Sequence, residues 1–234
     1  MPPRWDVRRL SQVDSTNRLV LDLARDGAAA GLVAVADVQT AGRGRLGRTW
    51  SAPPGASLLV TVLLRPADPV GQGHLLLNAC GLAAVEACDV ITGFRPDLKW
   101  PNDLVTARGK LAGLLAERDG DAVAVGMGLN VQWPATLPAD LVGVATALNH
   151  EVGRDVDRDA VLDAWLAALG RRLDALGDVA EEYRRTCATI GREVRVELPG
   201  ETFTGTATDV TDDGHLVVDG RAVSAGDVVH LRPI

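Results

Sequence analysis

The chain has 234 residues, 47% of them hydrophobic, which is enough for one sizeable domain with a packed core and a small appendage. Its net charge of -7 argues against general binding to nucleic acid, because an acidic protein repels it. The N-terminus lacks the apolar segment of a secretory signal, and no unbroken apolar run predicts a membrane span, so we expect a cytoplasmic protein without membrane contact.

The beginning of the chain alternates between strand and helix patterns. Apolar, β-branched runs between turn residues predict strands at residues 5–10, 31–38 and 57–64. Between the first two strands, Ser15 and Thr16 are cap residues for a helix that ends at Gly27.

Residues 74–88 have helical periodicity and contain two of the three cysteines, Cys80 and Cys88. Because the cysteines are odd in number and lack a CxxC spacing, we expect these two in the core and not in disulfides or metal sites. Three further strands follow, with a turn at Arg108-Gly109 between the first two, at residues 97–100, 110–117 and 122–131.

The residue pattern changes from helical to strand-like at Gly191. Before it, helices are predicted at residues 157–176 and 178–190. After it, segments that alternate apolar and polar residues between tight turns predict strands at residues 193–198, 201–210, 215–218 and 228–231. These 44 or so residues are too few to fold alone, so we expect a main domain at 1–190 and a small β-domain at 191–234 packed on it.

An arginine–glycine loop (residues 42–48) concentrates three arginines and three glycines in an acidic protein. Its glycines match the G-x-G-x-x-G pattern of dinucleotide-binding folds, but the following Pro53-Pro54 prevents the helix that such a site needs. Glycines bring backbone N–H groups close to a ligand, and arginines donate bidentately to carboxylates and phosphates. The loop therefore predicts a site for an anionic small molecule, with Trp50 as a flat surface for a purine; a solvated loop is the alternative.

Five unusual strings follow one another in the first part of the chain. They are Asp14-Ser15-Thr16-Asn17, Gln39-Thr40-Ala41 with the arginine–glycine loop, Lys99-Trp100-Pro101-Asn102-Asp103-Leu104, residues 109–117 and residues 125–131. Together, and in this order, they resemble the catalytic domain of biotin–protein ligases. The resemblance implies an α+β fold in which a mixed β-sheet is flanked by helices, as in class II aminoacyl-tRNA synthetases. It also implies that 1–190 is the biotin- and ATP-binding catalytic domain and that 191–234 is an SH3-like barrel.

The resemblance implies roles for individual residues. The biotin pocket would be lined by Ser15, Thr16, Asn17, Gln39, Arg43, Gly44, Arg45 and Lys110. ATP and the adenylate would contact Arg45, Arg48, Trp50, Asn102, Asp103 and Asn130. The catalytic cations would be Lys110, Arg45 and Arg48, with Asp103 as the one candidate ligand of Mg²⁺ and Arg232 as a further phosphate contact.

Some of these residues have ordinary structural roles as alternatives. Ser15 and Thr16 also suit helix capping, Asn102-Asp103 suits a turn, and Arg232 suits an exposed surface. By contrast, a lysine inside an apolar strand, as Lys110 is predicted to be, needs an anionic partner. The histidines have no spacing for a metal site or a catalytic triad, and we expect structural or surface roles for His74, His150, His215 and His230.

The implied reaction consumes ATP and biotin with Mg²⁺ and has two steps. The biotin carboxylate attacks the α-phosphate of ATP and gives biotinyl-5′-AMP and pyrophosphate. A lysine of a biotin carboxyl carrier domain, as in acyl-CoA carboxylases, then takes the biotinyl group and releases AMP. The loop would close over the anhydride and shield it from water.

Other functions stay open at this point. A lipoate–protein ligase or octanoyltransferase of the same fold is the nearest alternative, and a nucleic-acid-binding module that uses the arginine–glycine loop is a more distant one. The acidic charge and the scarcity of aromatic residues disfavour the latter. Since the first string begins at Asp14, we expect no winged-helix domain of the kind found in ligases that also repress transcription, and no DNA binding. The sequence leaves a homodimer open.

Overall fold

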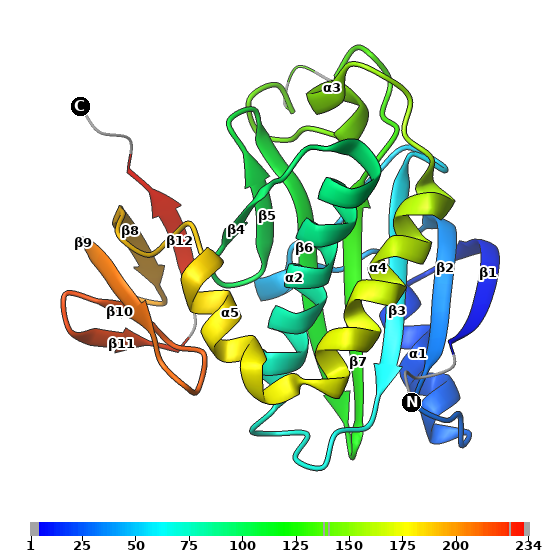
Figure 1. Ribbon diagram of the computed structural model, residues 1–234, viewed down its shortest axis with the longest axis horizontal. Coiled ribbons are helices and arrows are strands. Elements are labelled where there is room, and N and C mark those ends of the chain that lie inside the picture. The colour runs from blue at the N-terminus through cyan, green and yellow to red at the C-terminus, as the bar shows by residue number, and fades with distance from the viewer. Residues whose placement is uncertain (1–4, 138, 140, 225, 232–234) are drawn as a thin grey trace.

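A seven-stranded mixed sheet forms the centre of the computed structural model, which describes residues 5–137, 139, 141–224 and 226–231 (Figure 1). The strand order is β1-β2-β3-β7-β6-β5-β4; β1 and β2 are parallel, and the other neighbours are antiparallel. The strands are β1 (Asp6–Val13), β2 (Leu32–Gln39), β3 (Ser57–Leu64), β4 (Asp97–Lys99), β5 (Asp103–Thr106), β6 (Gly109–Asp119) and β7 (Ala122–Asn130). This confirms the predicted mixed sheet.

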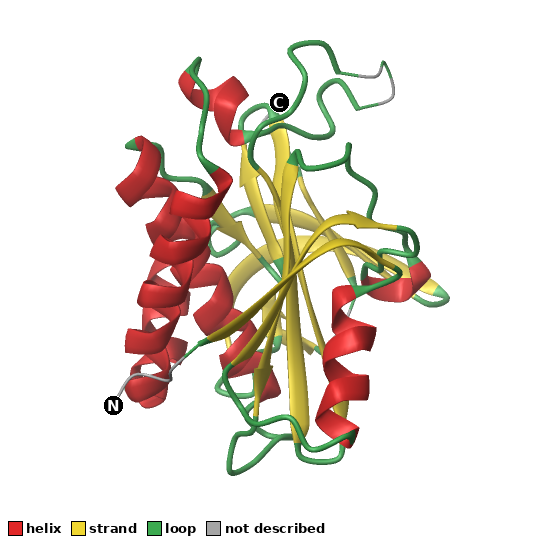
Figure 2. Cartoon of the chain, turned by 90° about the vertical axis from the view of Figure 1, so that its right-hand side faces the viewer, coloured by secondary structure: helices red, strands yellow, loops and turns green. Residues whose placement is uncertain are grey.

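Helices cover both faces of this sheet (Figure 2). On one face α1 (Thr16–Arg25) packs on β3 and β7, and on the other α2 (Gly73–Thr92) and α4 (Arg158–Asp174) pack together over the strands. The remaining helical segments are α3 (Leu148–Val152), a 3₁₀ turn η2 (Leu176–Asp178) and α5 (Val179–Thr186). Short segments were the ones that the sequence patterns missed, namely β5, α3 and, in the C-terminal sheet, β11 (Arg221–Val223).

Helix α2 is long and apolar enough to cross a membrane by length and composition alone, with a mean hydropathy of 1.6. In the structure it packs against α4 and against β6 and β7. Cys80 and Cys88 lie on its buried surface as free thiols, as predicted. These contacts are those of a core helix. A buried core helix can be as long and as apolar as a membrane-spanning one.

The C-terminal segment forms a five-stranded antiparallel sheet beside the main one (Figure 1). Its strands, in the order β11-β10-β9-β8-β12, include β8 (Glu193–Leu198), β9 (Glu201–Val210), β10 (Leu216–Val218) and β12 (Asp227–His230). This is the small C-terminal β-domain that was expected, an antiparallel sheet in which no ladder joins β11 to β12 within the described residues.

The C-terminal segment is attached to the main sheet by a hydrogen bond and by a shared core. The Trp100 indole N–H donates to the Gly214 carbonyl at 3.0 Å. Buried Val194 belongs to the same apolar cluster as the centre of the main domain. The small sheet thus packs on the main domain as expected, while the boundary at residue 190 stays a prediction.

His230 on β12 is half-buried where this sheet meets the main domain. Its Nε2 lies 3.0 Å from the hydroxyl of Thr189, which also accepts the Trp100 backbone N–H. Burial, reinforced by the positive charges of Lys99 and Arg192, lowers the pKa of His230 from 6.5 to about 4. The ring is therefore neutral in the folded protein under conditions where an unfolded chain would protonate it.

We expect His230→Gln to remove part of the acid sensitivity of the fold. As the pH falls from 6.5 towards 4, the unfolded chain takes up a proton at His230 that the folded chain does not bind, and this favours unfolding. The free energy of unfolding should therefore decline more steeply for the wild type than for the variant. Urea unfolding measured above and within this pH range tests the prediction, and equal declines in the two proteins would contradict it.

Candidate active site

A pocket of about 480 Å³ opens between the main sheet, the arginine–glycine loop and the edge of the C-terminal sheet. It brings together twelve of the fourteen site residues named from the sequence: Ser15, Thr16, Asn17, Gln39, Arg43, Gly44, Arg45, Arg48, Trp50, Asn102, Asp103 and Lys110. These residues come from segments almost a hundred positions apart. Of the other two, Asn130 does not line this pocket and Arg232 lies outside the described residues.

One end of the pocket is uncharged and closely hydrogen-bonded. The Gln39 side-chain oxygen accepts from the backbone N–H and the hydroxyl of Thr16, at 2.8 and 3.1 Å. The Thr61 hydroxyl lies 2.8 Å from the Thr16 hydroxyl and 2.6 Å from Asn17 Oδ1. Ser15 occupies the N-cap position of α1, but its side chain makes no cap hydrogen bond. Its hydroxyl is therefore left for the pocket, and capping does not account for it.

Two glycines of β7 leave space for the side chains of this pocket. A Cβ at Gly126 would collide with Asn17 Oδ1, and a Cβ at Gly128 would collide with the indole ring of Trp50. Any other residue at these positions would displace Asn17 or Trp50. The close approach explains why the string at 125–131 carries glycine at alternate positions on a strand.

The arginine–glycine loop is a short hairpin. Arg43 and Thr49 form an isolated antiparallel bridge, the Gly44 N–H donates to the Arg48 carbonyl at 2.7 Å, and the Trp50 N–H donates to the Gly42 carbonyl at 3.0 Å. Between them lies a single 3₁₀ turn, η1 (Arg45–Gly47). The chain then continues extended, so the structure confirms that no dinucleotide-binding helix begins here.

Each arginine of the loop has a polar or charged partner from another part of the chain. Arg43 lies 2.9 Å from Glu117 on β6, and Arg48 forms an ion pair with Asp227 on β12. Arg45 donates to the Asn102 side-chain oxygen at 3.3 Å. Burial is the main cause that lowers the pKa of Arg45, with nearby Asp227 opposing it.

Lys110 has the anionic partner that its position on a strand required. Its ammonium lies 2.6 Å from the Asp103 carboxylate, which begins β5, and 5.5 Å from the centroid of the Trp50 ring. Asn102 is a turn residue that also lines the pocket. Its side-chain amide donates to the Leu114 carbonyl at 2.6 Å. The turn and site interpretations of Asn102-Asp103 are thus compatible.

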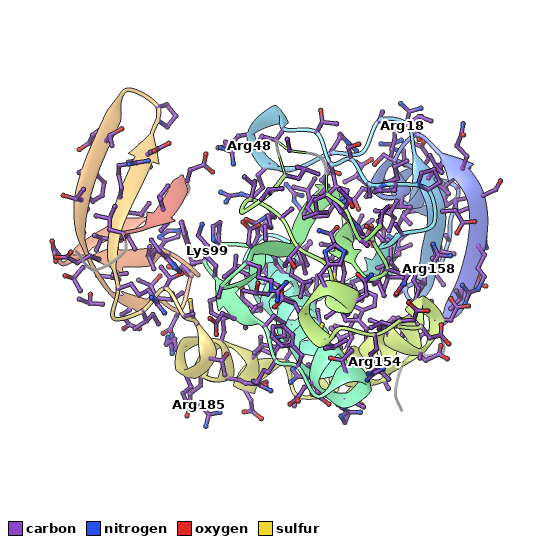
Figure 3. The ribbon with its side chains drawn as sticks, turned by 90° about the horizontal axis from the view of Figure 1, so that it is seen from above. Arg18, Arg48, Lys99, Arg154, Arg158 and Arg185 are labelled. Atoms are coloured by element: carbon purple, nitrogen blue, oxygen red, sulfur yellow. The ribbon has the colours of Figure 1, made fainter. Side chains whose placement is uncertain are left out.

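Lys99 is a pocket residue that the sequence analysis left without a role. Burial lowers its pKa, and the charges of Lys110 and Arg48 lower it further, while Asp103 and Asp227 oppose the effect. Figure 3 shows Lys99 and Arg48 on the side of the main domain that faces the C-terminal sheet. The only sequence signal was its place at the start of the string at 99–104. The pocket also includes residues of the C-terminal sheet that were not foreseen, Glu197, Asp227, Val228 and Val229.

A second pocket, of about 710 Å³, adjoins the first and shares Trp50 and Lys110 with it. Asn130 lines this second pocket. Its side-chain oxygen accepts from Ser57 at 3.1 Å, and its amide nitrogen donates to the Thr146 carbonyl at 2.9 Å. At the wall between the two pockets the indole N–H of Trp50 is buried, with no acceptor among the described residues.

Metal-binding side chains are sparse in the described part of the chain. No group of three or more His, Cys, Asp or Glu residues there could hold a metal ion by itself. Asp103, the candidate ligand of Mg²⁺, is engaged by Lys110. Arg232, named from the sequence as a phosphate contact, lies outside the described residues.

Comparison with known families gives two matches. The model of the biotin/lipoate A/B protein ligase family matches residues 10–132, and that of the biotin protein ligase C-terminal domain matches residues 189–231. The chain is 41% identical to the biotin–[acetyl-CoA-carboxylase] ligase of Mycobacterium tuberculosis, over 95% of this chain and 88% of the relative. It is 30% identical to the bifunctional ligase/repressor BirA of Bacillus subtilis, over 88% of this chain and 67% of the relative.

Among solved structures, the chain is similar to the biotin protein ligase from Aquifex aeolicus in complex with biotin and ATP. The TM-score is 0.82 at 28% sequence identity, and the match covers 97% of this chain and 99% of that one. The first family model alone spans more than half of the chain, and the relatives match nearly all of it. The chain belongs to the biotin/lipoate A/B protein ligase family.

Proposed function

We propose that this protein is a biotin–protein ligase, which activates biotin with ATP and transfers it to a lysine of another protein. The proposal rests on the first pocket, which has an uncharged, hydrogen-bonding end and a cationic end. Biotin has matching ends, a neutral urea and a carboxylate. The names of the M. tuberculosis relative and of the A. aeolicus structure with biotin and ATP support the same activity.

The uncharged end suits the ureido ring. Both amide hydrogens of Asn17 are donated to the protein, to Leu115 and Glu117, so its Oδ1 is the atom that can accept from a ring N–H. The hydroxyl of Ser15, which makes no cap hydrogen bond, adds a donor for the urea oxygen. With the ring at this end, the biotin carboxylate would lie toward Lys110 and the arginine–glycine loop.

The second pocket suits the adenosine of ATP, since it shares its boundary with the cationic end. Trp50 lies between the two pockets and offers both its ring face and its buried indole N–H. The phosphates would lie near Lys99, Lys110 and Arg48. In this arrangement Arg48 exchanges Asp227 for a phosphate when the nucleotide binds.

The first step requires one anion to attack another. Lys110, Arg45 and Arg48 offset the repulsion as the carboxylate oxygen bonds to the α-phosphorus and pyrophosphate leaves. In the second step the ε-amine of the acceptor lysine attacks the anhydride carbonyl and AMP leaves. The enzyme itself does not need to supply a nucleophile. The loop excludes water from the anhydride in the interval between the two steps.

We propose that Mg²⁺ acts with the nucleotide and has no dedicated site of its own. Mg²⁺ commonly keeps several waters and binds through one or two carboxylates together with substrate phosphates. Asp103, beside Lys110 at the cationic end, fits such a single-carboxylate contact. The ion would supply further positive charge at the phosphates.

The acceptor we propose is the biotin carboxyl carrier domain of an acyl-CoA carboxylase, in line with the names of the M. tuberculosis and Paracoccus denitrificans relatives. A lipoate ligase is disfavoured by the C-terminal match to the biotin protein ligase domain. ATP-dependent pyrophosphate release with biotin, lipoate and octanoate in parallel tests this choice. Release with biotin alone is expected, and release with lipoate in its place would overturn the proposal.

Lys99 yields a specific prediction about the nucleotide. Lys99→Met should raise the KM for ATP about tenfold, because it removes one charge-assisted contact to a phosphate. The Kd for biotin should stay unchanged. Arg108→Met, which removes a positive charge from the exposed turn before β6, is the matched control. Initial rates of pyrophosphate release across a range of ATP concentrations measure the effect. An unchanged KM in the Lys99 variant would place the triphosphate elsewhere.

A further inference from the structure

Glu117, on β6, connects two parts of the site that are far apart in the sequence. One of its carboxylate oxygens accepts from the Asn17 amide at 2.8 Å, and the other lies 2.9 Å from the Arg43 guanidinium. The Glu117 side chain is 25% exposed, and Asn17 is buried. The carboxylate therefore joins a buried residue of the uncharged end to an exposed arginine of the loop.

These contacts complete a continuous chain of polar side chains along the pocket. From the uncharged end to the loop it runs through Gln39, Thr16, Thr61, Asn17, Glu117 and Arg43. Every neighbouring pair lies within 3.1 Å. Glu117 is the one member of this chain that could pair electrostatically with the loop, because the members before it are uncharged.

We propose that Glu117 is a positioning residue that couples the ring-binding end of the pocket to closure of the arginine–glycine loop. The inference rests on the proposed ligase function. Glu117 fixes the Asn17 amide so that Oδ1, which already accepts from the Thr61 hydroxyl, keeps one lone pair for a ligand, and through Arg43 it holds the loop closed. A ligand that orders Asn17 therefore also favours the closed loop, and the closed loop favours the ligand by the same factor.

The two contacts of Glu117 can be separated by substitution. Glu117→Gln keeps an oxygen that can accept from Asn17 and removes the charge that holds Arg43. Glu117→Ala removes both contacts. Asp119→Asn is the matched control, since it neutralises a carboxylate on the same strand that pairs with Arg25 away from the pocket.

We expect Glu117→Gln to raise the rate at which biotinyl-AMP escapes about fivefold, equivalent to ~1 kcal/mol for a partly exposed pair, and to weaken biotin binding by about the same factor, because the coupling is reciprocal. Glu117→Ala, which also loses the contact to Asn17, should weaken biotin binding about fivefold more than Glu117→Gln does. Combining Arg43→Gln with Glu117→Gln should add nothing to the larger single effect. A merely structural role would not link the affinity for biotin to the exposure of the loop.

Escape is measured by trapping biotinyl-AMP released from the preloaded enzyme, and biotin affinity by calorimetry. Trypsin cleavage within the loop gives a readout that is independent of catalysis: Glu117→Gln should be cut faster than wild type, and Asp119→Asn should not. If wild type forms no biotinyl-AMP, the proposed function is wrong. The cleavage assay then tests by itself whether the Glu117–Arg43 pair holds the loop. Escape and cleavage rates of Glu117→Gln equal to those of Asp119→Asn would overturn the inference, as would additive effects of the Arg43 and Glu117 variants.

Discussion

Replacing Lys110 with alanine is expected to slow the formation of biotinyl-AMP about 30- to 1,000-fold, through a loss of roughly 2–4 kcal/mol in the transition state. The Lys110 ammonium lies where the two pockets meet, 2.6 Å from the Asp103 carboxylate. The reacting carboxylate and phosphate are both anions, so the variant loses a cation at the reacting centre. It also leaves the Asp103 carboxylate unpaired, which adds repulsion.

Pyrophosphate release in a single turnover, with saturating biotin and MgATP, measures this effect. The double variant Lys110→Ala/Asp103→Asn is compared with Asp103→Asn alone, because Asp103 is also the proposed contact of Mg²⁺; the two differ by the cation and leave no unpaired carboxylate. We expect the rate to fall less between these two variants than between wild type and Lys110→Ala. If Lys110→Ala released pyrophosphate within a few-fold of wild type, Lys110 would not lie at the reacting centre.

Arg45→Gly is expected to raise the escape rate of biotinyl-AMP roughly thirtyfold, the effect of losing ~2 kcal/mol of closure and contact energy. Arg45 is half-buried at the turn of the loop and donates to the Asn102 side chain at 3.3 Å. Glycine removes this donor and adds chain entropy to the open loop. Synthesis should suffer less than retention, since Lys110 and Arg48 still offset the negative charge.

The escaped anhydride would acylate lysines on bystander proteins, which makes the effect visible. Wild type and Arg45→Gly are incubated with biotin, MgATP and serum albumin, and albumin is probed for biotin. Arg45→Lys, which keeps the charge but loses the planar guanidinium, should fall between them. Equal labelling by wild type and Arg45→Gly, with pyrophosphate still released, would show that Arg45 does not retain the intermediate.

The sequence predicted the longer elements well, because their patterns are set by local chemistry. The bounds of β3, β8 and β9 coincide with the predicted runs, each of which lies between clear turn signals. Strand β5 was missed because it has four residues and directly follows the turn at Pro101-Asn102. Only its pairing with β4 and β6 makes it a strand, and pairing is not readable from four residues.

The candidate site was predicted in part for the same reason. The pocket brings together the site residues predicted within the recognisable strings, except Asn130, which lines the second pocket. Partners outside these strings were not: Asp227, which holds Arg48, lies in the C-terminal sheet, 179 positions away in the chain. Such partners depend on how the two sheets dock, and the sequence carries no local signal for that.

The central claim is tested most directly by the mass of an acceptor. The protein is incubated with biotin, MgATP and a biotin carboxyl carrier domain, beside a carrier whose acceptor lysine is replaced by arginine. The proposed function predicts that the intact carrier gains the mass of one biotinyl group, that ATP is required, and that the lysine-free carrier gains none. An unchanged mass of the intact carrier, with a folded enzyme and all substrates present, would contradict the assignment of this protein as a biotin–protein ligase.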